Sequence, residues 1–67
     1  MGLNMKLYSC NRKVYVTIVG DPTKEVFFFD HLDGMYSYCK NKKGEVVHLA
    51  AFTVVKVVDK PEGWDAE

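Results

Sequence analysis

The stretch that decides the fold is M-Y-S-Y-C-K-N-K-K-G-E-V-V-H-L, residues 35–49. Residues 35–40 alternate between side chains of two kinds, as a strand with two different faces does, and residues 45–49 return after a polar segment. That segment, N-K-K-G at 41–44, matches a type I turn that is closed by a glycine in a left-handed conformation. The sequence therefore predicts an antiparallel hairpin with a bulge at Gly44.

This turn determines which side chains share a face of the hairpin. With the bulge at Gly44, Tyr38 faces His48 and Tyr36 faces Ala50. The opposite face then carries the better set of core residues, which are Met35, Cys39, Val47 and Leu49. A shift of one residue would exchange the two faces, so the register decides whether the tyrosines point outward.

Short strands are also predicted on both sides of the hairpin, over residues 5–10, 13–19, 25–31 and 54–58. The three consecutive phenylalanines in 25–31 mean that at least one ring lies away from the main core, or that both faces are covered. Residues 50–53 are too few for a stable helix and suit a single 3₁₀ turn. We expect an all-β fold, a small closed or nearly closed barrel of five to six short antiparallel strands.

Length and composition limit the kind of protein this is. The chain has 67 residues, 48% of them hydrophobic, with nine basic and nine acidic side chains, which is the composition of one small globular domain. No apolar stretch approaches the roughly 20 residues of a membrane span, and the start does not resemble a signal peptide. We expect a cytoplasmic protein without membrane association. We expect residues 1–58 to form a single β-barrel domain and the acidic tail 59–67 to fray.

Residues 29–58 resemble the second half of an SH3-like barrel. The segments F-D-H-L-D-G-M-Y-S-Y-C-K, N-K-K-G-E-V-V-H-L, A-A-F-T and V-V-K-V-V follow the same order: an acidic-glycine turn, an aromatic strand, a distal hairpin, a 3₁₀ turn and a closing valine strand. Tudor and KOW domains share this plan. The resemblance implies the fold of a small SH3-like barrel, and the short chain is also similar to small bacteriophage proteins.

The resemblance does not extend to the groove that binds proline-rich peptides. Met35-Tyr36 stands where SH3 domains carry a tryptophan pair, Ala50 stands where they carry a proline, and Thr53 lies near the expected tyrosine. The resemblance thus implies the fold without PxxP binding. It also turns Tyr36 and Tyr38 inward, against the hairpin interpretation, so both orientations remain open.

Neither a metal site nor catalysis is predicted. The candidate metal ligands are Cys10, His31, Cys39 and His48, with 20, 7 and 8 residues between them, whereas structural zinc ligands come in close pairs. Cys39, His48 and Asp30 could be written as nucleophile, base and orienting acid, but such a set needs a cleft and an oxyanion hole. We therefore expect no enzyme, no cofactor and two reduced thiols.

The outward orientation would leave an exposed aromatic surface on the hairpin. We expect a non-catalytic interaction module that binds a protein partner, or a second copy of itself, through Tyr15, Tyr36, Tyr38 and His48. Tyrosine is enriched at the energetic centres of interfaces because it is amphipathic and has few rotamers.

The alternative is weak nucleic-acid binding by the lysines of the hairpin tip, Lys40, Lys42 and Lys43, with the adjacent tyrosines. Residues 1–58 hold eight basic and five acidic side chains and so carry +3, while residues 59–67 carry −3. Lysines at a hairpin tip are also ordinary solvated turn residues. The balanced net charge favours the protein partner, since dedicated nucleic-acid binders are more basic.

Overall fold

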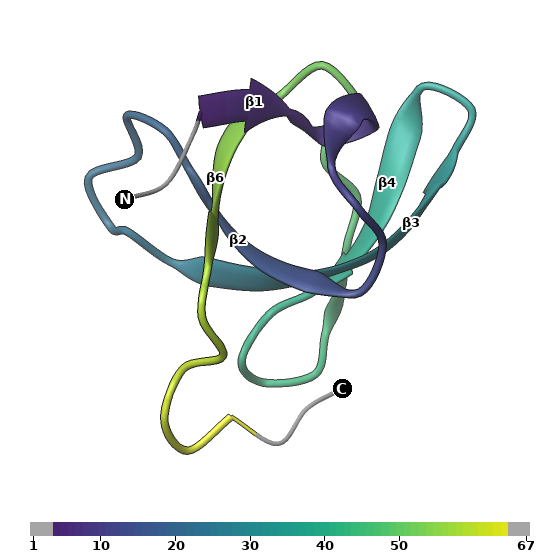
Figure 1. Cartoon of the computed structure of the whole chain (residues 1–67). Coiled ribbons are helices and arrows are strands. Elements are labelled where there is room, and N and C mark those ends of the chain that lie inside the picture. Colours follow the sequence, from purple (N-terminus) through teal and green to yellow (C-terminus); the bar gives the residue numbers. More distant parts are fainter. Residues whose placement is uncertain (1–3, 65–67) are drawn as a thin grey trace.

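One curled antiparallel sheet dominates the computed structural model, which describes residues 4–64 (Figure 1). Its strands are β1 (Asn4–Lys6), β2 (Val14–Ile18), β3 (Val26–Asp33), β4 (Tyr36–Lys40), β5 (Val46–Val47) and β6 (Val54–Val58). Their order across the sheet is β1-β6-β2-β3-β4-β5. The prediction of an all-β fold with five to six short antiparallel strands is confirmed.

The sheet is not closed into a barrel. Its edges are β1 and β5, and within residues 4–64 these two strands do not pair with each other. Turn segments bridge the space between them: the Tyr8 N–H donates to the Ala51 carbonyl at 3.0 Å, and the Ala51 N–H donates to the Met35 carbonyl at 2.8 Å. Because β5 ends after two residues, turns rather than a continuous ladder join the two ends of the curl.

The single 3₁₀ helix of the described residues is η1 (Leu7–Ser9), which follows β1 directly. The sequence did not predict η1, which lies within the strand expected over residues 5–10. Residues 50–53 form the single turn predicted for them, in which the Thr53 N–H donates to the Ala50 carbonyl at 3.0 Å, the i+3→i hydrogen bond of a 3₁₀ turn. The strand predicted over 5–10 stops early because the chain bends at η1 to bury Leu7 completely. Between residues 4 and 64 there is no helix long and apolar enough to cross a membrane.

The concave, inner face of the sheet carries the main core. The buried members are contributed by alternate positions of neighbouring strands and by η1, and they are Leu7, Val16, Phe27, Phe29, Cys39 and Val55. Burying an aliphatic or aromatic side chain of this size stabilises a fold by about 1.5–3 kcal/mol. The period of two along β2 and β3 thus decides which side chains build the interior.

The outer face carries a second, smaller cluster of buried rings, Tyr15, Phe28 and Trp64, here called the outer aromatic cluster. Tyr15 on β2 and Phe28 on β3 are cross-strand partners. Trp64 from the C-terminal segment covers both and is only 4% exposed. The phenylalanine run therefore serves both faces, as predicted. Trp64 belongs to the segment 59–67 that the sequence assigns to an acidic tail, and its indole packs on these rings instead of remaining in water.

Candidate partner-binding surface

The hairpin of β4 and β5 has the predicted register. Cys39 pairs with Val47, and Tyr36 forms a bridge with Ala50. Gly44 has a φ of +85°, the left-handed conformation that the turn requires, and the Asn41 N–H donates to the Glu45 carbonyl at 3.0 Å. The local turn chemistry thus sets the faces of β4.

On this register, the tyrosines of β4 point outward and its small residues point inward. Tyr36 is 60% exposed and Tyr38 is 36% exposed, whereas Ser37 and Cys39 are buried. The orientation implied by the SH3 resemblance is therefore wrong for these two rings. Met35, expected in the core, is also exposed, because it lies in the turn between β3 and β4 rather than in the strand.

Tyr38 is held between two histidine rings. His31 of β3 stacks on it with ring centroids 4.7 Å apart and planes 14° from parallel. His48 meets it edge-on, with centroids 4.6 Å apart. We call Tyr36, Tyr38, His31 and His48 together the aromatic patch.

His31 is the member of the patch that the sequence did not predict. The register of β3 against β4 shifts between Phe29 and His31, so that Asp30 is an extra residue in β3. This β-bulge brings His31 opposite Tyr38 and returns Leu32 to the side of the main core. The sequence of β3 by itself does not indicate a bulge. The bulge lets His31 pack on Tyr38 while Leu32 packs against the main core.

Hydrogen bonds fix both imidazoles of the patch. His48 Nδ1 donates to the Ser37 carbonyl at 3.1 Å, because a carbonyl oxygen can only accept. His31 Nδ1 donates in the same way to the Asp30 carboxylate, which also accepts from Lys13 Nζ at 2.9 Å. The hydrogen bond from Lys13, with a second from His31, holds the pKa of Asp30 below its ordinary value. In a neutral ring, each histidine keeps Nε2 as its remaining acceptor.

A shallow depression of about 370 Å³ adjoins these rings. Its lining residues are Asp33, Tyr36, Tyr38 and His48. Three of the four belong to the aromatic patch, and the fourth adds a carboxylate at its rim. The patch therefore offers a concave surface with an exposed phenol, a fixed phenol and polar groups at its edge.

Tyr15, the remaining tyrosine predicted for this surface, lies elsewhere. It is buried in the outer aromatic cluster, where its ring centroid is 5.1 Å from that of Phe28 and 5.4 Å from that of Trp64. The structure does not bring it together with Tyr36, Tyr38 and His48. The alternation of β2 correctly puts Tyr15 on the outer face, but Trp64 covers that part of it.

The lysines of the hairpin tip lie at the other end of β4 from Tyr36. Lys42 and Lys43 are exposed in the turn, and Lys40 is half-buried as the last residue of β4. Asn41 Oδ1 accepts the Lys43 N–H at 2.9 Å, which orders the tip. Because His31 already stacks on one face of Tyr38, that face is not available to a nucleic-acid base.

The cysteines and histidines that could be written as one site lie on opposite faces of the sheet. Cys39 and Cys10 belong to the main core, and burial raises the pKa of both thiols. His31 and His48 lie on the outer face with Asp30. Across residues 4–64, no three histidine, cysteine or acidic side chains gather as a metal site would require.

Comparison with protein-family models, with curated proteins and with solved structures gives no match for this chain.

Proposed function

We propose that this protein is a non-catalytic interaction module that binds a protein partner, or a second copy of itself, through the aromatic patch. The observation that carries the proposal is the exposure of Tyr36 beside a Tyr38 ring that is clamped between two histidines. Large aromatic side chains left at the rim of a depression are the residues that most often dominate the energy of an interface.

Preorganisation strengthens this argument. A side chain that is immobilised on binding costs about 0.5–1.5 kcal/mol of entropy. The stacking of His31 and the edge contact of His48 have already restricted Tyr38 before any partner arrives. The cost of ordering it is then small, so more of its contact energy remains for the complex.

We also propose that the fold is a variant of the SH3-like barrel. The support is the order of elements that carried the resemblance: the β4–β5 hairpin, then the turn at 50–53, then β6 with its valines. The open edge between β1 and β5 and the outward tyrosines of β4 would distinguish it from that family's usual plan. A contact surface on the outside of β4 does not need a proline-peptide groove.

The experiment is size-exclusion chromatography with light scattering over a range of concentrations, followed by affinity capture from the native host if the protein is monomeric. We expect Tyr36→Ala and Tyr38→Ala to weaken the association about tenfold or more, as truncations at interface centres do. Tyr8→Ala is the control, because Tyr8 is an exposed tyrosine (56%, close to the 60% of Tyr36) in η1, outside the patch. The proposal would be contradicted if all three variants weakened the association equally, or if none of them weakened it.

The second candidate is weak nucleic-acid binding by Lys40, Lys42 and Lys43. Its specific support is the ordered, exposed lysine pair at the tip of the hairpin. Such binding should weaken steeply with added salt, and each lysine removed should lower the salt slope by about one. Binding that survives Lys42→Glu with Lys43→Glu would eliminate this candidate.

A further inference from the structure

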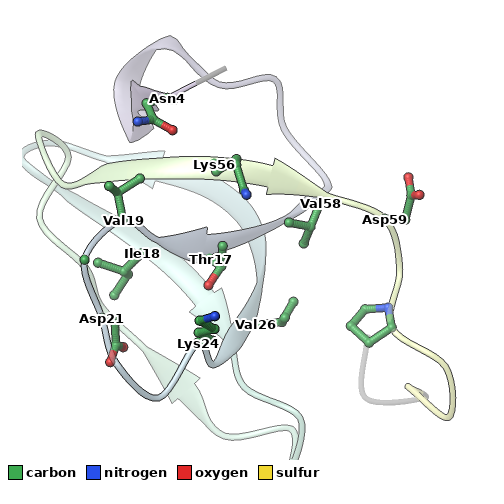
Figure 2. A pocket seen from close by; sticks show the side chains of 12 residues that line it. Asn4, Thr17, Ile18, Val19, Asp21, Lys24, Val26, Lys56, Val58 and Asp59 are labelled. Atoms are coloured by element: carbon green, nitrogen blue, oxygen red, sulfur yellow. The ribbon is translucent and has the colours of Figure 1, made fainter. Parts of the chain in front are cut away.

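A second depression lies away from the aromatic patch, across β1, β6, β2 and β3 (Figure 2). Its volume is about 570 Å³. None of its lining residues belongs to the aromatic patch or to the lysine tip. We call it the lysine groove, after Lys24 and Lys56, which line it.

The floor of the groove is a row of cross-strand neighbours on the outer face. Asn4 pairs with Lys56, Lys56 pairs with Thr17, and Thr17 pairs with Val26. Side chains at paired positions point to the same face of a sheet, so these four lie side by side. The row crosses from the β1 edge of the sheet to β3.

The lysine groove lies next to the outer aromatic cluster, beyond the part of the sheet that Trp64 covers. Val26 and Val58 pack against that cluster and also line the groove. Asp59 and Pro61 of the C-terminal segment form one wall, and the turn after β2 forms the other. The groove is thus a part of the outer face that Trp64 does not cover, and its apolar side, Val26 and Val58, lies next to the cluster.

The basic side chains that line the groove point into it, and the acidic ones point out of it (Figure 2). Figure 2 shows the Lys56 amino group pointing from β6 into the groove and the Lys24 amino group below Thr17, whereas the carboxylates of Asp21 and Asp59 point away. Asp21 Oδ1 is already engaged by its own turn, where it accepts the Thr23 N–H at 3.0 Å and the Thr23 hydroxyl at 2.9 Å.

Neither lysine is neutralised within the groove. Among residues 4–64, no ion pair involves Lys24 or Lys56. The Thr17 hydroxyl donates to the Glu25 carbonyl at 3.1 Å, so its proton is already committed. The hydrogen-bond donors that remain are the two ammonium groups and the Asn4 amide, and all three suit an anionic oxygen.

We propose that the lysine groove binds a small organic anion, whose carboxylate or phosphate head group lies between Lys24 and Lys56 and whose apolar body packs against Val26 and Val58. Two cations that line the same groove beside an apolar wall match a ligand with both features. An inorganic ion would use only the lysines, and a neutral apolar molecule only the valines. This site is independent of the aromatic patch.

The test is a titration of ¹⁵N-labelled protein with phenylacetate, phenyl phosphate and the neutral phenylacetamide, followed by amide chemical shifts. We expect saturable shifts at Thr17, Gly20 and Val26 with an anionic probe, at a dissociation constant of about 1 mM or tighter for ligands of this size. Binding of either anion supports the proposal and identifies the head group. Phenylacetamide should bind about tenfold more weakly or worse, since it lacks the charge.

Two double variants separate the groove from general electrostatic attraction. Lys24→Gln with Lys56→Gln should weaken anion binding about tenfold or more, while Lys42→Gln with Lys43→Gln, which changes the net charge equally, should leave it unchanged. Circular dichroism checks that each variant is folded. Equal losses in both variants, equal binding of the amide, shifts centred on Tyr36 and Tyr38, or no saturable shifts up to about 20 mM would each overturn the proposal.

Discussion

The outer face of the sheet carries two groups of aromatic rings with opposite fates. On β2 and β3, Tyr15 and Phe28 are buried under Trp64. On β4, Tyr36 and Tyr38 lie on the same face of the same sheet, and the rings that contact Tyr38 within residues 4–64 are the imidazoles of His31 and His48. The difference is the cover: Trp64 packs on the first group and not on the second.

This comparison indicates which group is structural and which is available. Aromatic side chains that a protein covers with its own chain contribute to its stability. Those left exposed in a cluster, beside a depression, contribute little to folding and are candidates for a partner. The two groups should therefore respond in opposite ways to mutation, one in stability and the other in association.

The largest expected effect comes from removing the cover. Trp64→Ala should lower the free energy of unfolding by about 3 kcal/mol, because it deletes a buried aromatic ring and exposes Tyr15 and Phe28. Urea unfolding followed by circular dichroism measures this.

Trp64→Phe is the informative companion to that variant. Trp64 Nε1 is buried without a hydrogen-bond partner among the described residues, and a phenyl ring removes that unpaired donor while keeping most of the cover. We expect Trp64→Phe to cost less than about 1.5 kcal/mol. If Trp64→Ala were as stable as the parent protein, the rings under Trp64 would not differ in structural role from the exposed tyrosines of β4.

The next effect should come from the turn that points the β4 tyrosines outward. Gly44→Ala places a side chain at a φ of +85° and should destabilise the protein by about 1–2 kcal/mol. Lys43→Ala, one residue away in the same turn, should change stability by no more than about 0.5 kcal/mol. Thermal unfolding of the two variants provides the comparison, and equal melting temperatures would argue against the left-handed turn.

A smaller effect on stability should distinguish the two exposed tyrosines of β4 from each other. Tyr38→Ala should cost about 1 kcal/mol of folding stability, because its ring contacts His31 and His48. Tyr36→Ala should stay within about 0.5 kcal/mol, as expected for an exposed side chain. Chemical unfolding distinguishes the two, and a large loss for Tyr36→Ala would mean that this residue is structural.

The smallest effect concerns how the stability contributed by Asp30, which accepts a hydrogen bond from His31, depends on pH. The pKa of Asp30 is lowered in the fold by Lys13 and His31, so its contribution is present above the ordinary carboxyl pKa and is lost as the pH falls through the lower folded value. Asp30→Asn should cost at most about 1 kcal/mol near pH 7. Its stability should approach that of the parent protein near pH 2, and a difference that grows on acidification would contradict this sign.

Local chemistry accounts for the parts of the fold that the sequence predicted well. The β4–β5 register follows from Asn41 and Gly44, whose conformational preferences act within the turn. The errors lie where distant segments compete for space. The strand predicted over 5–10 gives way to the 3₁₀ helix η1 at Leu7–Ser9, which buries Leu7 in the main core. The sheet stays open because β5 is short.

The features of the candidate surface also differ in whether local sequence or tertiary contacts determine them. Period-two alternation and one turn are short-range properties, so the amino-acid order alone determined that Tyr36 and Tyr38 point to one side of β4 and Cys39 to the other. Only the tertiary structure decided that Trp64 would cover Tyr15, that a bulge at Asp30 would bring His31 onto Tyr38, and that Lys24 and Lys56 would line one groove. These outcomes depend on contacts between segments far apart in the chain, and no local conformational preference encodes such contacts.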